Sequence, residues 1–127
     1  MTTVQTQTWL LVAVAGAVGT LLRYGLGGWI ARTTGGPFPL YTFLINAVGC
    51  LAIGIVSGAV ERGAILSPQH RTALAVGLIG GFTTYSTFAL DAFRLASARQ
   101  WTVAAAYVVA TNVVGLAAVW AGYKVAA

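Results

Sequence analysis

Charged side chains are scarce in this chain of 127 residues. Seven basic and two acidic residues make up 7% of the sequence, whereas soluble domains carry about 25%. So few charges cannot cover a surface that faces water, and the composition therefore excludes an ordinary soluble globule and a disordered chain. A nucleic-acid partner is excluded as well, because the basic residues are scattered singly and such binding needs a clustered basic patch.

Residues that commonly bind metals or carry out catalysis are scarce too. The single cysteine, Cys50, lies within an apolar run, and there is a single histidine, so the chain offers neither an internal disulfide nor a zinc or haem site. Glu61 and His70 both lie in a loop, and no nucleophile, base and acid occur together. The sequence therefore predicts that the protein is not an enzyme.

Apolar residues dominate what remains, at 58% of the chain. They form four long stretches, and a helix of about 20 apolar residues is enough to cross a bilayer. We expect an all-α integral membrane protein with a single domain, residues 1–127, and both termini on one side of the lipid bilayer. The predicted spans are residues 9–31, 40–60, 71–96 and 101–123.

The basic residues that flank these spans are balanced. Apart from Arg23, which lies within the first span, three are on the side of the termini and three on the other. Since orientation follows the asymmetry of such charges, we expect the chain to insert both ways and to form an antiparallel, dual-topology homodimer. The alternative is that one charge dominates and sets a single orientation. The two groups are Arg62, Arg71 and Lys124, and Arg32, Arg94 and Arg99.

The middle of the third span is a poor helix former. Gly80 and Gly81 begin a run of hydroxyl and aromatic residues that ends at Phe88, and this composition has low helix propensity. We predict that the third helix is broken at its middle, because broken membrane helices supply ion sites. The alternative is a continuous helix whose hydroxyls bond to carbonyls one turn earlier. Farther along, Asp91 is the only acid in any span and can pair with Arg94.

Side chains that suit an anion lie near this break. Tyr85 and Phe88 are three residues apart, so their rings share a helix face and can offer positive ring edges, while Ser86 and Thr87 add hydroxyls. Asn46, near the middle of the second span, offers two N–H donors and needs a partner or water there. The alternative for the aromatic pair is ordinary packing or contact with lipid.

Small and polar residues also recur at steps of four. Such a face indicates either a close helix–helix seam or a hydroxyl track along a wet pore, and we favour the seam for the glycines of the second span. Arg23 can snorkel to the interface, draw anions into a vestibule or tie loops together. The recurring residues are Thr42, Asn46, Cys50, Gly54 and Gly58 in the second span and Tyr107, Thr111 and Gly115 in the fourth.

Three segments, in order along the chain, carry motifs of a known family. They are residues 19–24 (GTLLRY), residues 39–49 (PLYTFLINAVG), which are close to P-x-G-T-L-x-V-N-x-x-G, and residues 80–88 (GGFTTYSTF), which are close to G-G-x-T-T-F-S-T-F. The chain thereby resembles the small bacterial fluoride channels called Fluc or CrcB. The resemblance implies passive fluoride export across the bacterial cytoplasmic (inner) membrane by an antiparallel homodimer with two pores and a structural sodium ion (Na⁺) at its interface.

The resemblance also implies roles for individual residues, with three departures from the family pattern. Tyr85 stands where the family usually has phenylalanine, Tyr41 replaces a glycine, and Gly115 stands where some members carry a hydroxyl. The implied anion-binding pore residues are Asn46, Tyr85, Ser86, Thr87, Phe88, Tyr107 and Thr111. Arg23 and Thr42 would belong to the vestibule or its framework, and the backbone carbonyls of Gly80 and Thr83 would hold the sodium ion.

The chemistry of fluoride is consistent with a pore lined by these hydroxyl, amide and aromatic side chains. Fluoride holds its hydration water tightly, so a pore must replace that water with many donors, and neutral donors still let the ion leave. Two other functions stay open at this point. A small multidrug-type exporter would need an acid in the first span, which this chain lacks, and a non-transporting assembly subunit would use the glycine seams to join other membrane proteins.

Overall fold

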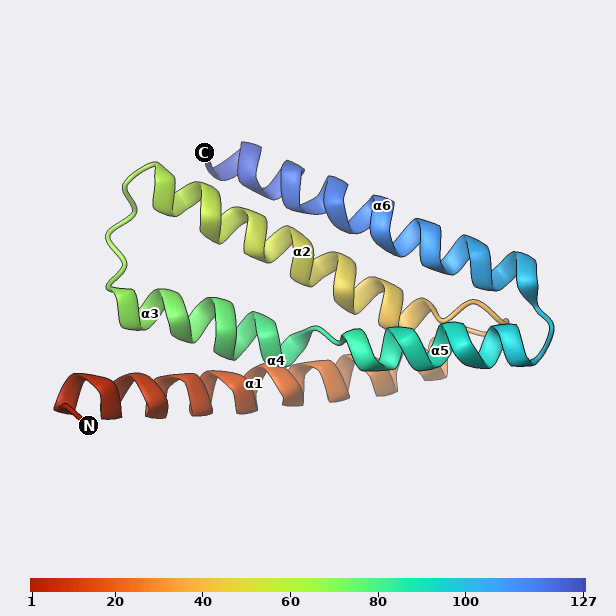
Figure 1. Ribbon diagram of the computed structural model, residues 1–127, viewed down its shortest axis with the longest axis horizontal. Coiled ribbons are helices and arrows are strands. Elements are labelled where there is room, and N and C mark those ends of the chain that lie inside the picture. The colour runs from red at the N-terminus through yellow and green to blue at the C-terminus, as the bar shows by residue number, and fades with distance from the viewer.

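The computed structural model describes residues 1–127 and is all-helical, with four helical crossings long and apolar enough to span a membrane. Both termini and the link between the second and third crossings lie at the left end in Figure 1, and the other two links lie at the opposite end. The expectation of four apolar helices long enough to cross a bilayer is confirmed. The elements are α1 (Thr3–Thr33), α2 (Leu40–Glu61), α3 (Pro68–Thr72), the π-helical segment η1 (Ala73–Ile79), α4 (Gly80–Phe82), α5 (Tyr85–Ser97) and α6 (Trp101–Ala126).

Helix α1 begins at Thr3, six residues before the predicted span. Thr2 and Gln5 form a reciprocal cap, in which the Thr2 hydroxyl accepts from the Gln5 amide and the Gln5 side chain accepts from the Thr2 amide. This capping box satisfies two amides that a helix start would otherwise leave free. Because the residues involved are polar, hydropathy alone does not detect this start.

Helices α2 and α6 pack closely because glycines line their contact. A Cβ atom added at Gly54 would overlap the Val119 carbonyl, one at Gly58 would overlap the Tyr123 carbonyl, and one at Gly122 would overlap the backbone of α2. Figure 1 shows the two helices side by side along their length. The seam predicted for the second-span glycines is confirmed.

Helix α1 packs against the third crossing in the same way. A Cβ atom at Gly19 would overlap the Leu78 carbonyl, and one at Gly81 would lie 2.6 Å from the Gly16 carbonyl oxygen. The contact runs through η1 and α4, which are the segments just before the centre of the third crossing. The backbone of α1 therefore lies directly against the point where the third helix ends.

The third crossing is broken, as predicted. Helix α4 ends at Phe82, Thr83 and Thr84 are extended (ψ 161° and 118°), and α5 begins at Tyr85. The continuous-helix alternative is excluded by these angles. The π-helical turns of η1 before the break are a feature that sequence reasoning did not predict, and such turns are frequent at functional sites.

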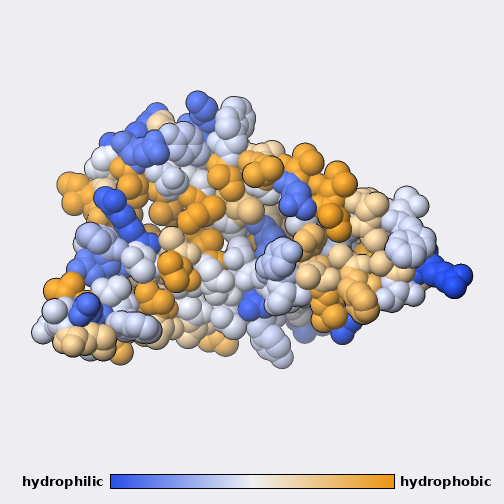
Figure 2. Space-filling model, viewed as in Figure 1, coloured by the Kyte–Doolittle hydropathy of each residue, from blue (hydrophilic) through white to orange (hydrophobic).

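The outer surface is largely apolar. Of 127 residues only 15 are buried, and large apolar side chains such as Trp9, Leu21 and Leu116 are more than half exposed. Figure 2 shows hydrophobic side chains spread over the visible face, with hydrophilic ones concentrated toward the ends. A surface of this kind is stable only in lipid or against another apolar protein surface.

The α2–α6 seam makes a prediction with a matched control. Gly54→Ala places a methyl group against the Val119 carbonyl and should destabilise the fold by about 1–3 kcal/mol, the usual effect of overpacking. Gly25→Ala is the same change at a helical position with no heavy atom within 4 Å of the new Cβ. Thermal unfolding in detergent, followed by circular dichroism, should show a lower midpoint for Gly54→Ala only. Equal midpoints would contradict close packing at this seam.

Candidate functional site

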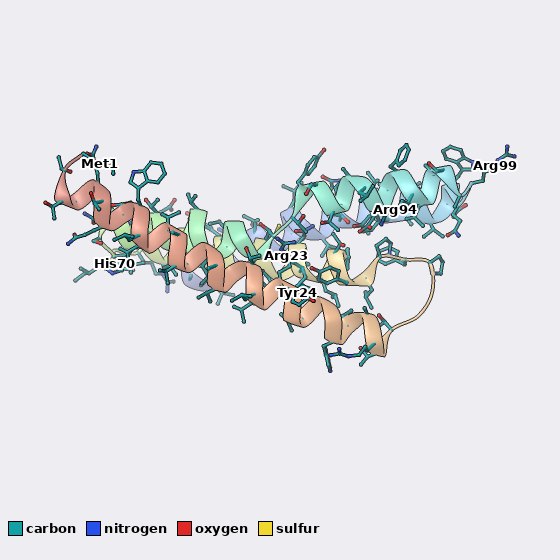
Figure 3. The ribbon with its side chains drawn as sticks, turned by 90° about the horizontal axis from the view of Figure 1, so that it is seen from below. Met1, Arg23, Tyr24, His70, Arg94 and Arg99 are labelled. Carbon is teal, nitrogen blue, oxygen red and sulfur yellow. The ribbon has the colours of Figure 1, made fainter.

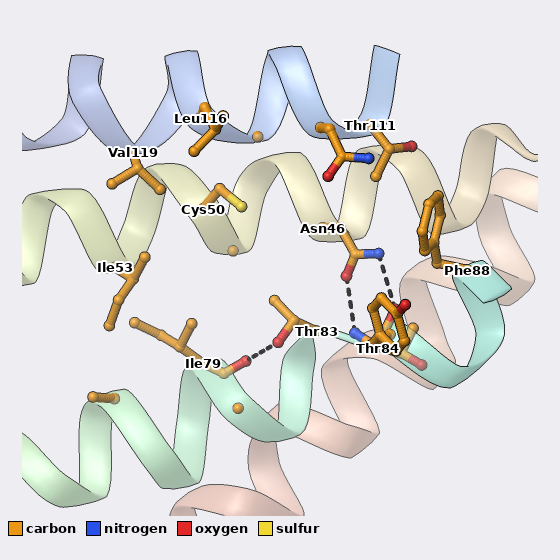
Figure 4. Close-up of a pocket in the computed structure, with 16 residues that line it drawn as sticks. Asn46, Cys50, Ile53, Ile79, Thr83, Thr84, Phe88, Thr111, Leu116 and Val119 are labelled. Atoms are coloured by element: carbon orange, nitrogen blue, oxygen red, sulfur yellow. Dashed lines mark hydrogen bonds between the residues drawn. The ribbon is translucent and has the colours of Figure 1, made fainter. Parts of the chain in front are cut away.

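A groove of about 490 Å³ opens between α2, α6 and the third crossing on both sides of its break. Figure 4 shows these elements converging on it. The predicted site residues that line the groove are Asn46, Gly80, Thr83, Tyr85, Phe88 and Thr111. Those that do not line it are Arg23, Thr42, Ser86, Thr87 and Tyr107. The groove thus brings together residues from α2, α4, α5 and α6 that are far apart in the sequence.

Asn46 is joined to the break itself. Its side-chain oxygen accepts from the Thr84 amide at 2.8 Å, and its amide nitrogen donates to the Thr84 carbonyl at 3.0 Å; Figure 4 draws both bonds. One side chain therefore replaces both hydrogen bonds that Thr84 loses by leaving the helix. The second N–H of the amide has no protein partner, so the predicted donor role still has one proton available.

Four carbonyls lose their helical donors at the break. In a continuous helix the amides of residues 84–87 would donate to the carbonyls of Gly80, Gly81, Phe82 and Thr83. The Thr84 amide instead donates to Asn46, and the Thr87 amide donates to the Thr84 hydroxyl at 3.2 Å. Gly80 and Thr83 are the two of these four residues that line the groove.

Arg23 satisfies one of these four carbonyls at the break. Its Nε donates to the Gly81 carbonyl at 3.2 Å, and the side chain is half-buried. Figure 3 places Arg23 between Met1 at one end of the molecule and Arg99 at the other. The guanidinium is therefore turned inward onto the break, which favours a tie between α1 and α4 over snorkelling.

Hydroxyl groups gather at the start of α5. The Thr84 side chain caps the helix, its hydroxyl donates to Thr87 Oγ1 at 3.0 Å, and Ser86 Oγ lies 3.5 Å from Thr84 Oγ1. Ser86 is exposed and Thr87 is half-buried. The amides at the first turn of a helix carry partial positive charge, so hydroxyls and helix dipole both favour an anion at this position.

Aromatic rings continue from the start of α5 into the bundle. The Tyr85 and Phe88 ring centroids lie 5.8 Å apart, and those of Phe88 and Tyr107 lie 5.2 Å apart. The prediction that Tyr85 and Phe88 share one face is confirmed. Tyr85 is 79% exposed, whereas Tyr107 is fully buried, so the rings lead from the open groove into the interior.

Asp91 does not pair with Arg94, and the expectation of that pair was wrong. The carboxylate oxygen Oδ2 accepts from the Thr42 hydroxyl at 2.8 Å and from the Tyr107 hydroxyl at 3.3 Å. Both donors are almost completely buried, so they need an acceptor, whereas Arg94 is exposed and can remain in water. Asp91 is thus a site residue that sequence reasoning missed, although its position one turn after Phe88 was a usable signal.

The hydroxyl of Thr111 differs from those at the start of α5, because it forms no hydrogen bond. Its oxygen is inaccessible to solvent and has no hydrogen-bond partner within the chain. A buried hydroxyl without a partner costs free energy. Because Thr111 lines the groove, a change of its χ1 rotamer would be needed to present this hydroxyl to the open space. One turn later, at Gly115, the Cys50 sulfur lies 3.4 Å from where a Cβ would be, so the thiol packs beside the space that a side chain there would take.

Taken together, fold and site define a small integral membrane protein in which a groove beside a broken helix is lined by neutral groups. Hydroxyls, an amide, ring edges and free carbonyls contact the groove, and no charged side chain lines it. Groups of this kind can bind an ion weakly, but they cannot take up and release protons near neutral pH. The class is therefore one that suits passive passage of an ion.

Comparisons with known proteins identify the family. Residues 10–123 match the family described as CrcB-like protein, Camphor Resistance (CrcB), and the chain belongs to it. Three relatives are each named Fluoride-specific ion channel FluC, the last with the number 2. The relative from Nitratidesulfovibrio vulgaris is 43% identical over 89% of this chain and 91% of its own length. The one from Methylobacillus flagellatus is 41% identical over 91% of both chains. The one from Symbiobacterium thermophilum is 44% identical over 91% of this chain and 94% of its own length.

The double bond between Asn46 and Thr84 makes a testable prediction. Asn46→Ala leaves the Thr84 amide and carbonyl without partners, and each unsatisfied group costs about 1–3 kcal/mol. The unfolding midpoint should fall, and the Thr84 amide should exchange its hydrogen faster. Asn112→Ala is the matched control, because that amide donates only to the Val108 carbonyl of its own helix. Similar midpoints for the two variants would show that the pair does not support the break.

Proposed function

We propose that this protein is a fluoride-selective channel that gives passive fluoride export across the bacterial cytoplasmic membrane. The observation that carries the proposal is that residues from two of the three family motifs, 39–49 and 80–88, line one groove of neutral groups, in a chain 41–44% identical to proteins named as fluoride-specific channels. Such export would protect cytoplasmic enzymes when fluoride enters as HF.

The donors of the site are suited to replacing the hydration shell of a small anion. The hydroxyls of Ser86, Thr87 and Thr111 and the free N–H of Asn46 offer protons, and the ring edges of Phe88 and Tyr85 add weaker attraction. None of these groups is charged, so the ion is held by many contacts and still released. Tyr107, whose hydroxyl bonds to Asp91, marks the inner end of this series.

A second copy in the opposite orientation would complete the pathway. The groove is open on one side, Tyr85 is exposed on it, the neighbouring Ser86 is exposed as well, and much of the surface is apolar. The three-to-three balance of basic residues supports insertion in both orientations, and a two-fold dimer is the commonest way for a small protein to enclose a site. We therefore propose the antiparallel homodimer, with two pores.

The break supports the structural sodium site at the centre of that dimer. Gly80 and Thr83 line the groove, their carbonyl oxygens have lost their helical donors, and neutral oxygens are suitable ligands for a hard cation. Two carbonyls from each copy would hold the ion. When bound there, sodium would raise the local potential for anions and link the two chains.

The proposed function is tested by fluoride efflux from liposomes. Purified wild-type protein should release fluoride, read with a fluoride electrode, and should not release chloride in a parallel measurement. Phe88→Ile removes the ring between Tyr85 and Tyr107 and should abolish fluoride efflux while size-exclusion chromatography still shows a dimer. Efflux at the wild-type rate would remove Phe88 from the pathway, and a silent wild-type protein would favour an assembly role over a channel.

The dual topology is tested separately in cells. Two fusions at the C-terminus are needed, one with a reporter that is active only in the cytoplasm and one with a reporter that is active only in the periplasm. Both fusions should give signal. Adding two lysines to the link at residues 98–100 should shift the signal toward one side, because the present balance is three to three. Signal from a single side in the unmodified chain would contradict insertion in both orientations.

A further inference from the structure

Phe38 lies in the link between α1 and α2 and belongs to none of the predicted site residues. It stands between Pro37 and Pro39, which restrict the backbone on both sides. Pro39 has φ −74° and ψ 70°, and the Leu40 amide donates to the Phe38 carbonyl at 2.7 Å. These values describe an inverse γ-turn, which turns the chain sharply just after Phe38 and limits the directions its ring can take.

The Phe38 ring packs against two other rings in edge-to-face geometry. Its centroid lies 5.4 Å from that of Tyr107 at an interplanar angle of 84°, and 5.5 Å from that of Phe43 at 75°. Phe88 contacts Tyr107 as well. The Tyr107 ring, which is fully buried, is therefore in contact with a ring of the pathway, Phe88, and with a ring of the link, Phe38.

The hydroxyl of Tyr107 depends on the position of its ring. It reaches Asp91 Oδ2 at 3.3 Å, near the upper limit for such a bond, on an oxygen that Thr42 already contacts at 2.8 Å. The hydroxyl oxygen lies on the axis of χ2, so a flip of the ring does not move it, but a small tilt of the side chain about χ1 would break the bond to Asp91 and leave a buried hydroxyl unpaired. Phe38 and Phe88 are the aromatic contacts that resist this tilt.

We propose that Phe38 is a positioning residue of the fluoride pathway, which holds the Tyr107 ring so that its hydroxyl stays on Asp91. The inference rests on the proposed channel function. Phe38 does not line the groove, and its ring reaches the site through its contact with Tyr107. The link between α1 and α2 thereby contributes to the proposed pathway, although Phe38 lies outside the helices that form the groove.

The experiment combines efflux and stability. Phe38→Ala should lower fluoride efflux by about threefold to tenfold, the factor that corresponds to the loss of one aromatic pair. Phe38→Leu keeps much of the side-chain volume but loses the ring edge. It should also lower fluoride efflux, and it replaces Phe38→Ala if that variant does not fold. Phe38→Tyr keeps the ring and should retain efflux. Phe93→Ala is the matched control, because Phe93 is 68% exposed and makes none of these ring contacts.

A double-mutant cycle separates positioning from general support of the fold. Tyr107→Phe removes only the hydroxyl, so it should lower the unfolding midpoint in the wild-type background and have little effect in Phe38→Ala. Equal losses in both backgrounds, or unchanged efflux in a folded Phe38→Ala or Phe38→Leu variant, would overturn the proposal. A silent wild-type protein would instead refute the channel function, and the cycle would still decide whether Phe38 holds Tyr107.

Discussion

The broken third crossing depends on the pair of hydrogen bonds between Asn46 and Thr84. An extended residue in the middle of a membrane helix is costly, because lipid offers no partner for its amide and carbonyl. The oxygen of a carboxamide and one of its two N–H groups lie at the right separation to satisfy both. Since Asn46 takes over these groups, the helix can end and begin again within the crossing. The carbonyls freed at the break, the start of α5 and the hydroxyls around it all follow from this interruption.

Much of the fold could be predicted from the sequence, because it follows from local properties. Apolar runs of sufficient length defined the four crossings, and Gly80 and Gly81 followed by hydroxyl residues indicated the break. Glycines at steps of four predicted the seam of α2. The polar first turn of α1 was missed because a cap at Thr2 is invisible to hydropathy, and the π-helical turns of η1 were missed because an apolar run does not distinguish them from an α-helix.

The partners of the polar side chains could be predicted much less well, because they are distant in sequence. Asn46 and Thr84 are 38 residues apart, and Thr42 and Asp91 are 49 apart. Spacing within one helix suggested Arg94 as the partner of Asp91, but the buried hydroxyls of two other crossings use that carboxylate instead. Candidate residues could therefore be identified by type and depth, whereas their hydrogen bonds required the packed bundle.

Two side chains from neighbouring helices restrict movement at the break. Arg23 holds the end of α4 from α1, and Asn46 holds the residue before α5 from α2. In transporters that alternate between two open states, one bundle of helices rocks against another around a site built from broken helices. Here the break is tied to α1 through Arg23 and to α2 through Asn46, and α1 packs closely on α4. Ties to two neighbouring crossings oppose such a movement, which suits a passage of constant shape and not a rocking carrier.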